Sequence, residues 1–353
     1  MKATVHPYLL NFKQPAGTSR GILRTKESFF LRIEDAGSPF GIGLGEVGVL
    51  RGLSVDDVPE LESQLVWTAK NIHLGLEELY VRNRIFPSVQ FALEQAFSHL
   101  QHGFHHFETP FSSGEQGQSI NGLIWMGSKE FMLDQIQRRL EEGFKTLKMK
   151  VGAISWADEL TLLKGIRERF SASELILRVD ANGAFDRSSI VPVLNELAAL
   201  EVHSIEQPLP PTDREGLAEI CASSPVPIAL DESLIGVFSA FEKELLLDAV
   251  QPQYIILKPS FIGGWRGADE WIDCANARGI DWWATSALES TVGMNAIAQW
   301  TATKQLHLPQ GLGTGSLYTN NIPGPLEVKN GELWTVGDVQ KLWSFPDSFT
   351  PFK

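Results

Sequence analysis

Between residues 116 and 313 the chain alternates short apolar segments with longer segments whose apolar residues recur every three or four positions. The short segments have the length and composition of buried strands, and the longer ones have the period of amphipathic helices. Seven or eight such units favour a closed parallel barrel over an open sheet. The predicted strands are Asn121–Met126, Thr146–Val151, Ile176–Asn182, Ser204–Pro208, Pro227–Ser233, Tyr254–Pro259, Asp281–Ser286 and a short one near Leu308–Leu312. The clearest helical patterns are Lys129–Glu142, Trp156–Phe170 and Ser188–Leu200.

The first 115 residues lack this regular alternation and mix strand and helix patterns. Ser28–Glu34 has a strand pattern, and a glycine-rich turn runs through Gly45. The polar, glycine-containing run Ser112–Ser119 is typical of a linker. We therefore predict a separate N-terminal domain over residues 1–115 and a barrel domain over residues 116–313. The helical patterns expected in the first domain are Val55–Leu74 and Pro87–Leu100.

The alternation stops again after Gly313. Pro325–Trp334 has the pattern of a hairpin, in which Asn330 and Gly331 supply the two positive-φ residues of a tight turn. We expect this tail, residues 314–353, to pack on the N-terminal domain.

Composition and charge narrow the classes of function. The 353 residues are 43% hydrophobic and 21% charged, as in globular proteins. The net charge of −13 argues against a nucleic-acid or anionic-membrane surface, because both need clustered basic residues. A signal peptide is not evident, and the apolar runs are shorter than the roughly 18 residues of a membrane span. Cys221 and Cys274 fit buried, reduced thiols, so we expect a cytoplasmic protein.

Three acidic residues end consecutive predicted strands. Asp180, Glu206 and Asp231 are 26 and 25 residues apart, one strand–helix unit each time. Barrel enzymes carry their chemistry at the C-terminal ends of the strands, so these side chains should converge there. A helix N-cap would explain any one of them alone, but the regular interval favours a shared site. Converging carboxylates repel one another, and a Mg²⁺ or Mn²⁺ ion with oxygen ligands would relieve that repulsion.

Three lysines belong to the same set of strand ends. Alternation along Thr146–Val151 places Lys148 and Lys150 together on one face. Both faces of a barrel strand are covered, so two inward ammonium groups need acidic partners or a function. Lys258 ends the sixth strand, across the barrel from the second. We predict that Lys150 and Lys258 flank a ligand and that one acts as a general base, the alternative being surface lysines at strand ends.

The order Lys-x-Lys, Asp, Glu, Asp, Lys along strands two to six resembles the muconate-lactonizing subgroup of the enolase superfamily. The resemblance covers nearly the whole chain. It implies an α/β fold, a modified TIM barrel of the (β/α)₇β type. Residues 1–115 and the tail 314–353 would together form an α+β capping domain. Further matching segments are Gly43–Val47, Arg51–Ser54, Pro87–Glu94, Ile120–Leu123 and Ser286–Ser290.

The resemblance also implies catalytic roles. The three acids would hold Mg²⁺, which would bind the substrate carboxylate and stabilise the enediolate formed by proton loss. Lys150 would remove the α-proton and then, as its conjugate acid, help hydroxide leave as water. Lys258 would stabilise the intermediate from the opposite face, and Lys148 would tune the pKa of Lys150. Within the subgroup, the greatest resemblance is to lyases that dehydrate a cyclohexadiene carboxylate in menaquinone biosynthesis.

Candidate substrate-binding residues follow strands six and seven. Phe261–Trp265 opens a helix, so free N–H groups at Gly263 and Gly264 would be placed to bind a carboxylate; an ordinary tight turn is the alternative. Ser286 and Leu288 lie near the start of the next helix. For them too, the sequence is consistent with substrate binding or with an ordinary tight turn. Apolar side chains that suit a ring and a succinyl chain are Phe261, Ile262, Trp265 and Leu288.

Two early segments, Ala16–Arg24 and Gly48–Ser54, are predicted to be loops that close over the barrel mouth. Gly43–Gly48 matches the spacing of a dinucleotide fingerprint, but a loop-like segment follows instead of a helix. We expect a turn there that reaches the site.

Related activities remain open. A dipeptide epimerase or an N-succinylamino-acid racemase of the same subgroup would share the metal and the lysines. Dipeptide epimerases carry Asp-x-Asp after the eighth strand to hold the substrate ammonium, whereas this chain has the acid-free segment Gly311–Ser316 there. The racemase is not disfavoured by this, because its substrate amine is acylated. A non-catalytic metabolite-binding barrel is a third alternative. A small-molecule carboxylate is the expected partner, and the oligomeric state is open.

Overall fold

The computed structural model describes residues 1–18, 21–152, 154–304, 306–313, 315 and 317–345. Its centre is a parallel sheet in which seven strands pair in chain order. Residues 310 and 311 bridge to Ile120 and Thr285, one at each edge of the sheet, and so close it into a barrel where the eighth strand was predicted. The strands are β5 (Gly122–Ile124), β6 (Thr146–Lys150), β7 (Ile176–Asp180), β8 (Ser204–Glu206), β9 (Ile228–Leu230), β10 (Tyr254–Leu257) and β11 (Asp281–Ala284).

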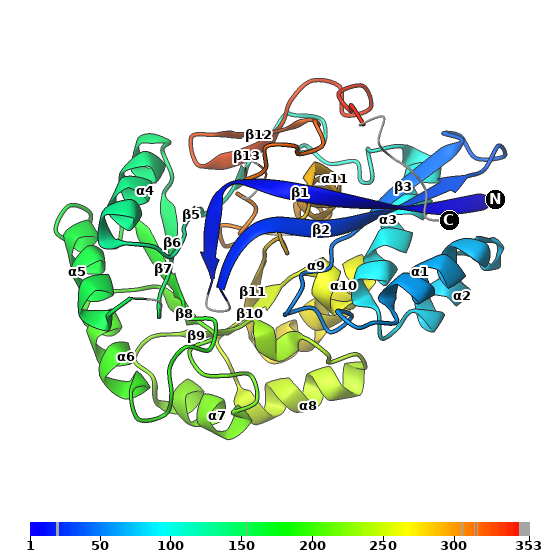
Figure 1. Ribbon diagram of the computed structural model, residues 1–353. Helices are drawn as coiled ribbons and strands as arrows, with labels where there is room; N and C mark the ends of the chain where they lie inside the picture. Colours follow the sequence, from blue (N-terminus) through cyan, green and yellow to red (C-terminus); the bar gives the residue numbers. More distant parts are fainter. Residues whose placement is uncertain (19–20, 153, 305, 314, 316, 346–353) are drawn as a thin grey trace.

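Helices surround this barrel (Figure 1). Several begin at a residue whose side chain accepts a backbone N–H, which satisfies a donor that the helix start leaves free. Ser128, Ser155, Asp213, Ser239 and Ser290 do so. The helices are α4 (Lys129–Glu141), α5 (Trp156–Arg167), α6 (Ile190–Ala199), α7 (Arg214–Ser223), α8 (Ala240–Val250), α10 (Gly264–Asn276) and α11 (Thr291–Ala302), with the short η2 (Glu232–Leu234) and α9 (Pro259–Ile262) after β9 and β10.

The chain before the barrel forms a three-stranded antiparallel sheet with helices packed on it, which we call the cap. Its first strand, β1, pairs with β2 from Lys2 opposite Glu34 to the hairpin end, a longer sheet than the sequence pattern indicated. Figure 1 shows this hairpin extending from the cap over the barrel, and Gly17 there bridges to Met126. The elements are β1 (Lys2–Thr18), β2 (Gly21–Glu34), β3 (Ile42–Val47), α1 (Leu61–Lys70), η1 (Ile72–Leu74), α2 (Gly75–Arg82) and α3 (Pro87–His102).

Two expectations for the cap are wrong. Residues 43–47 are not a turn but part of strand β3, because Gly43 and Gly45 allow helix α3 to approach closely. An added Cβ on these glycines would lie 2.2 and 1.9 Å from the carbonyl oxygens of Ala96 and Ala92. Residues 16–18 and 21–24 belong to the paired strands of the hairpin instead of a loop, while positions 19 and 20 lie outside the described residues.

The tail forms the predicted hairpin, β12 (Leu326–Lys329) and β13 (Glu332–Thr335), with positive φ at Asn330 and Gly331. Strand β13 also pairs with β4 (Gln118–Ser119), inside the predicted linker. Further along, Trp343 stacks on Phe104 beside the end of α3. The tail thus contacts both barrel and cap, and the boundaries 1–115 and 116–313 stay a prediction. Positions 314, 316 and 346–353 of the tail lie outside the described residues.

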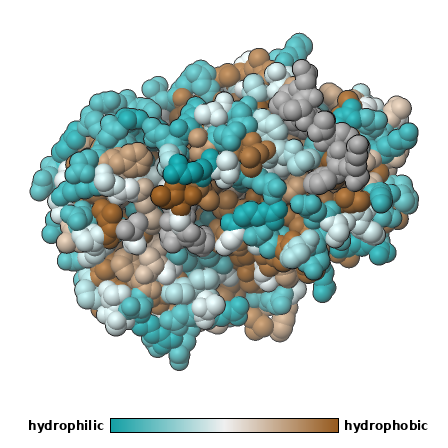
Figure 2. Space-filling model, in the orientation of Figure 1, coloured by the Kyte–Doolittle hydropathy of each residue, from teal (hydrophilic) through white to brown (hydrophobic). Residues whose placement is uncertain are grey.

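Figure 2 shows hydrophilic residues over most of the face drawn in Figure 1, with apolar residues exposed in small separate patches. Among the described residues, every helix is too short or too polar to cross a lipid bilayer.

Candidate active site

The C-terminal ends of the barrel strands and two segments of the cap enclose a cavity of about 360 Å³. An apolar cavity with a few convergent polar groups is the usual form of a small-molecule site. Its charged and amide side chains from the barrel are Asn121, Lys148, Lys150, Asp180, Asn182, Glu232 and Lys258. Its large apolar side chains are Leu23, Leu50 and Leu53 from the cap and Leu123, Trp125, Phe261 and Leu288 from the barrel.

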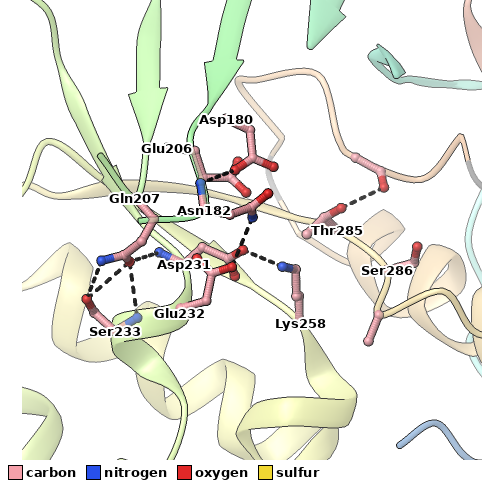
Figure 3. Close-up of polar contacts among 12 residues, drawn as sticks. Asp180, Asn182, Glu206, Gln207, Asp231, Glu232, Ser233, Lys258, Thr285 and Ser286 are labelled. Carbon is pink, nitrogen blue, oxygen red and sulfur yellow. Dashed lines mark hydrogen bonds and ion pairs between the residues drawn. The ribbon is translucent and has the colours of Figure 1, made fainter. Parts of the chain in front are cut away.

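The structure joins the three predicted lysines to the three predicted metal ligands. Lys148 Nζ lies 3.0 Å from Asp180 Oδ2 and 2.6 Å from Glu206 Oε1. Lys150 Nζ lies 2.9 Å from the same Asp180 oxygen. Lys258 Nζ donates to Asp231 Oδ2, as Figure 3 shows. The three carboxylates are almost fully buried, whereas all three lysines line the cavity. The structure thus brings these six residues together at one end of the barrel, and their roles stay predictions.

Alternation along the strands explains this convergence. Lys148 and Lys150 point into the barrel, while Leu147 and Met149 lie on the other face of β6, in the main apolar core of the protein. In the neighbouring strand β7, Asp180 is paired in register with Lys150. Asp180 is in turn paired with Glu206 of β8. The pleat and the parallel register thus bring Lys150, Asp180 and Glu206 to one level.

Burial and neighbouring charges both shift the pKa values of these side chains. Burial alone would lower the pKa of Lys148, but Asp180, Glu206 and Asp231 raise it above its ordinary value. Burial would raise the pKa of Asp180, yet the three lysines hold it well below its usual range. For Glu206, burial and the charge of Asp180 raise the pKa. An additional positive charge among these acids would therefore favour the ionised form of Glu206.

The ammonium groups stand between the acids. Within the described residues, no three His, Cys, Asp or Glu side chains already surround a point where a metal ion would bind. Glu206 Oε2 is buried and makes no hydrogen bond with the part of the chain that the structure describes. The acids offer oxygen donors only, which suit a hard divalent cation. The donor set fits such an ion if the lysines move off the carboxylates.

Sequence reasoning missed three polar residues beside these acids. Asn182 Oδ1 accepts from Lys150 Nζ at 2.7 Å. Figure 3 shows the side-chain amide of Asn182 directed at Glu232, to whose Oε1 it donates at 2.9 Å. Gln207 Oε1 accepts the backbone N–H of Asp231 at 3.1 Å and so fixes the start of η2. A signal existed for all three, because Asn182 lies two residues after Asp180, Gln207 directly follows Glu206 and Glu232 directly follows Asp231.

The predicted substrate-binding residues divide into two pairs. Ser286 and Leu288 line the cavity, but Gly263 and Gly264 are absent from its described lining. Gly263 O accepts from Tyr80 of the cap at 2.6 Å instead. An added Cβ on Gly264 would lie 2.1 Å from a carboxylate oxygen of Glu94.

Glu94 of α3 also accepts the N–H groups of Trp265 and Arg266, at 2.5 and 3.2 Å. A carboxylate of the cap therefore binds the start of α10, where a substrate carboxylate was expected. Trp265 packs against Phe91 and Phe107, so of the four apolar candidates only Phe261 and Leu288 are among the described lining residues.

The second predicted loop does reach the cavity, which Leu50, Arg51, Gly52 and Leu53 line. Charged contacts hold its position. Arg51 donates to Glu27 at 2.9 Å and to Asp57 at 2.7 Å, and Gly52 N–H donates to Asp57 at 2.7 Å.

A barrel with buried acids and lysines at the C-terminal ends of its strands is consistent with the family that the comparisons with known proteins identify. Residues 132–337 match the family described as Enolase C-terminal domain-like, and the chain belongs to this family, within the enolase superfamily of enzymes. An o-succinylbenzoate synthase from Desulfotalea psychrophila is 43% identical over 92% of this chain and 96% of its own length.

The solved structures agree. The crystal structure of MenC from Desulfotalea psychrophila covers 95% of this chain and 99% of its own, with a TM-score of 0.83 and 39% identity. A dipeptide epimerase from Enterococcus faecalis, determined with Mg and the dipeptide L-Leu-L-Tyr, has a TM-score of 0.82 at 20% identity. It covers 96% of this chain and 97% of its own, and at that identity it supports the fold alone.

Proposed function

We propose that the chain is an o-succinylbenzoate synthase, a lyase that removes water from 2-succinyl-6-hydroxy-2,4-cyclohexadiene-1-carboxylate in menaquinone biosynthesis. The observation that carries this proposal is the 43% identity to the Desulfotalea psychrophila enzyme over nearly the whole of both chains. The site is consistent with it, because lysines from strands on different sides of the barrel line one cavity. The proposed setting is the cytoplasm.

Asp180, Glu206 and Asp231 are the proposed ligands of a Mg²⁺ ion, with Mn²⁺ as a substitute. They are buried oxygen donors, and Glu206 Oε2 has no other partner among the described residues. When bound, the ion supplies positive charge that stabilises the negative charge placed on the substrate carboxylate by proton loss.

Lys150 is the proposed base. Its ammonium nitrogen bonds to Asp180 and Asn182, so two acceptors orient it at the edge of the cavity. As a neutral amine it takes the α-proton of the substrate. The electron pair left on carbon then expels the hydroxyl group of the ring, which leaves as water with the proton that Lys150 now carries. The ring becomes aromatic, so the elimination is strongly downhill.

Lys258 and Lys148 have supporting roles in this proposal. Lys258 directly follows β10, on the other side of the metal strands from β6, and its positive charge would stabilise the enediolate from the opposite face. Lys148 lies between Asp180 and Glu206 and would influence the pKa of Lys150 through those acids. The apolar lining from Phe261 and Leu288 suits the ring and its side chain.

A racemase that acts on N-succinylamino acids is the second candidate. Racemisation requires a proton-transfer group on each face of the α-carbon, and two opposed lysines would meet this requirement. A dipeptide epimerase is disfavoured. In the described lining the acidic residues are Asp180, which is paired with Lys150, and Glu232, which accepts from Asn182. Neither carboxylate is therefore available to bind a substrate ammonium group.

A comparison of substrates tests the proposal. Purified protein with Mg²⁺ is given the diene acid and, separately in D₂O, N-succinylamino acids and Ala-Glu dipeptides. Rapid loss of diene absorbance with slow or absent α-deuterium exchange is the expected result. Fast exchange of an amino-acid derivative without elimination would replace the synthase by a racemase or an epimerase.

A further inference from the structure

Leu288, in the wall of the cavity, has a left-handed backbone with φ of 63°. A bulky residue adopts this conformation only where its surroundings impose it. Hydrogen bonds on both sides do so. Ala287 N–H donates to Glu289 Oε2 at 2.7 Å, and the Leu288 carbonyl accepts from the Tyr318 hydroxyl at 2.7 Å. Glu289 and Tyr318 are both buried, so these bonds hold the peptide group between residues 286 and 287 and the peptide group after Leu288.

The second oxygen of Glu289 contacts another part of the cavity wall. Ser260 Oγ donates to Glu289 Oε1 at 2.5 Å. Ser260 lies between Lys258 and Phe261, so this bond ties the wall after β11 to the segment that carries the catalytic lysine and a large apolar side chain. One carboxylate therefore sets the relative position of two segments of the site.

Two glycines make room for this side chain. A Cβ added to Gly293, in the first turn of α11, would lie 2.8 Å from Glu289 Cγ. A Cβ added to Gly48 would lie 3.0 Å from the same atom and 2.7 Å from Ser260 Oγ. Gly48 begins the loop whose residues 50–53 line the cavity, so Glu289 packs where three segments of the wall meet.

The cap supplies the opposite charge. Lys26 of β2 is buried, and its ammonium donates to Ser28 Oγ at 2.8 Å, which in turn donates to Glu46 Oε1 at 2.9 Å. Glu46 then accepts the N–H of Ser290, the residue after Glu289, at 2.9 Å. Burial raises the pKa of Glu289, and the charge of Lys26 opposes that rise. The buried carboxylate thus depends on a cap residue for its compensation.

We infer that Glu289, assisted by Tyr318, is a positioning residue that sets the shape of the apolar wall and so the fit of the non-reacting part of the substrate. The described lining does not include Glu289 itself. It acts through Ala287 and Leu288 on one side and through Ser260 on the other. The inference rests on the proposed function for its substrate, but the wall geometry can be tested without turnover.

Glu289→Ala and Glu289→Gln separate this role from a general loss of stability. The alanine variant loses both hydrogen bonds and should raise KM for the diene acid about tenfold. Its kcat and Mg²⁺ affinity should stay within about threefold of the wild type, the pattern of lost binding that ground and transition states share. The glutamine amide can still accept from Ala287 and donate to Ser260, so this variant should restore KM.

Glu94→Ala is the matched control, because Glu94 is also a buried carboxylate that accepts two hydrogen bonds, and it lies away from the described lining. It should lower stability and leave KM unchanged. Tyr318→Phe removes a single hydroxyl and, if Glu289→Ala does not fold, should itself raise KM about threefold.

Amide hydrogen exchange gives a readout that does not need the proposed substrate. Exchange in the peptide covering residues 284–291 should be faster in Glu289→Ala and Tyr318→Phe than in Glu94→Ala. Wild-type exchange in that peptide, or a wild-type KM in folded Glu289→Ala, would overturn the inference. Absence of turnover in the wild type, with exchange altered as expected, would instead count against the proposed function alone.

Discussion

Lys150 and Lys258 enter the cavity with different partners. Lys150 bonds to Asp180 and Asn182, whereas Lys258 bonds to Asp231. In the proposed function, Lys150 moves a proton and Lys258 stabilises charge on the opposite face of the bound acid. We expect Lys150→Ala and Lys258→Ala each to lower kcat by about 10³ or more, because acid–base and electrostatic terms are each of that order.

Lys148→Ala should have a smaller effect on kcat and shift the pH profile, since it acts through the acids. Steady-state kinetics and thermal unfolding would be measured together, with exposed Lys164 replaced by alanine as the control. Wild-type turnover in Lys150→Ala would show that the base is another residue.

Asp231 tests the metal at the level of one residue. The carboxylate of Asp231 lies beside Lys258. Replacement by asparagine keeps the shape of this side chain and removes its negative charge. We expect Asp231→Asn to weaken Mg²⁺ binding in calorimetry and to lower activity, and a chelator to abolish the activity of the wild type. Full activity of Asp231→Asn with excess chelator present would exclude a metal role for these acids.

The position of these residues could be predicted from sequence because strand ends recur at a fixed interval, whereas their roles as metal ligands and base stay predictions. Gly263 and Gly264 lie outside the described lining of the cavity, and the contact beside them is not local in sequence. Glu94, which binds the N–H groups of Trp265 and Arg266, precedes them by about 170 residues. Pattern along the chain carries no information on such a contact.

Among the elements, the segment after β3 contributes the described residues 50–53 of the cap to the cavity lining, beside Leu23 of the hairpin. Asp57 fixes it by accepting from Arg51 and from the N–H of Gly52. We expect Asp57→Ala to raise KM several-fold, because the loop residues that line the cavity lose their anchor, while Mg²⁺ affinity stays unchanged. Exposed Glu60→Ala is the control. An equal loss of metal binding in Asp57→Ala would contradict a role confined to the substrate.

The contact between α3 and α10 predicts a dependence of stability on pH. Burial raises the pKa of Glu94 to about 8, although the N–H groups of Trp265 and Arg266 oppose the rise. Between its ordinary value of 4.5 and about 8 the folded protein therefore holds one proton more than the unfolded chain. The free energy of unfolding should fall as pH rises through that range, by up to about 1.4 kcal/mol per pH unit.

Glu94→Gln should flatten this slope, because the amide does not titrate. Urea unfolding of both proteins from pH 5 to pH 8 measures the difference. Parallel stability curves would show that Glu94 is not the group responsible.

Across the whole molecule, the barrel was predictable and the cap only in part. Parallel strands buried on both faces have continuous apolar sequences that stand out from their helices. Strand β1, by contrast, mixes exposed and buried residues along its length, and β3 contains two glycines whose role depends on helix α3. Residues 310 and 311 close the barrel, and β13 pairs with β4. Both contacts join segments that are distant in sequence, so local sequence patterns do not show which segments pair.

The central claim is that the acids hold a metal and that Lys150 and Lys258 flank the substrate. A crystal structure with Mg²⁺ and o-succinylbenzoate tests it most directly. The account predicts one ion bound by Asp180, Glu206 and Asp231, with the lysines moved off these acids and the Nζ atoms of Lys150 and Lys258 on opposite faces of the ligand. An ion bound elsewhere, or a product molecule outside the cavity between the two lysines, would contradict it.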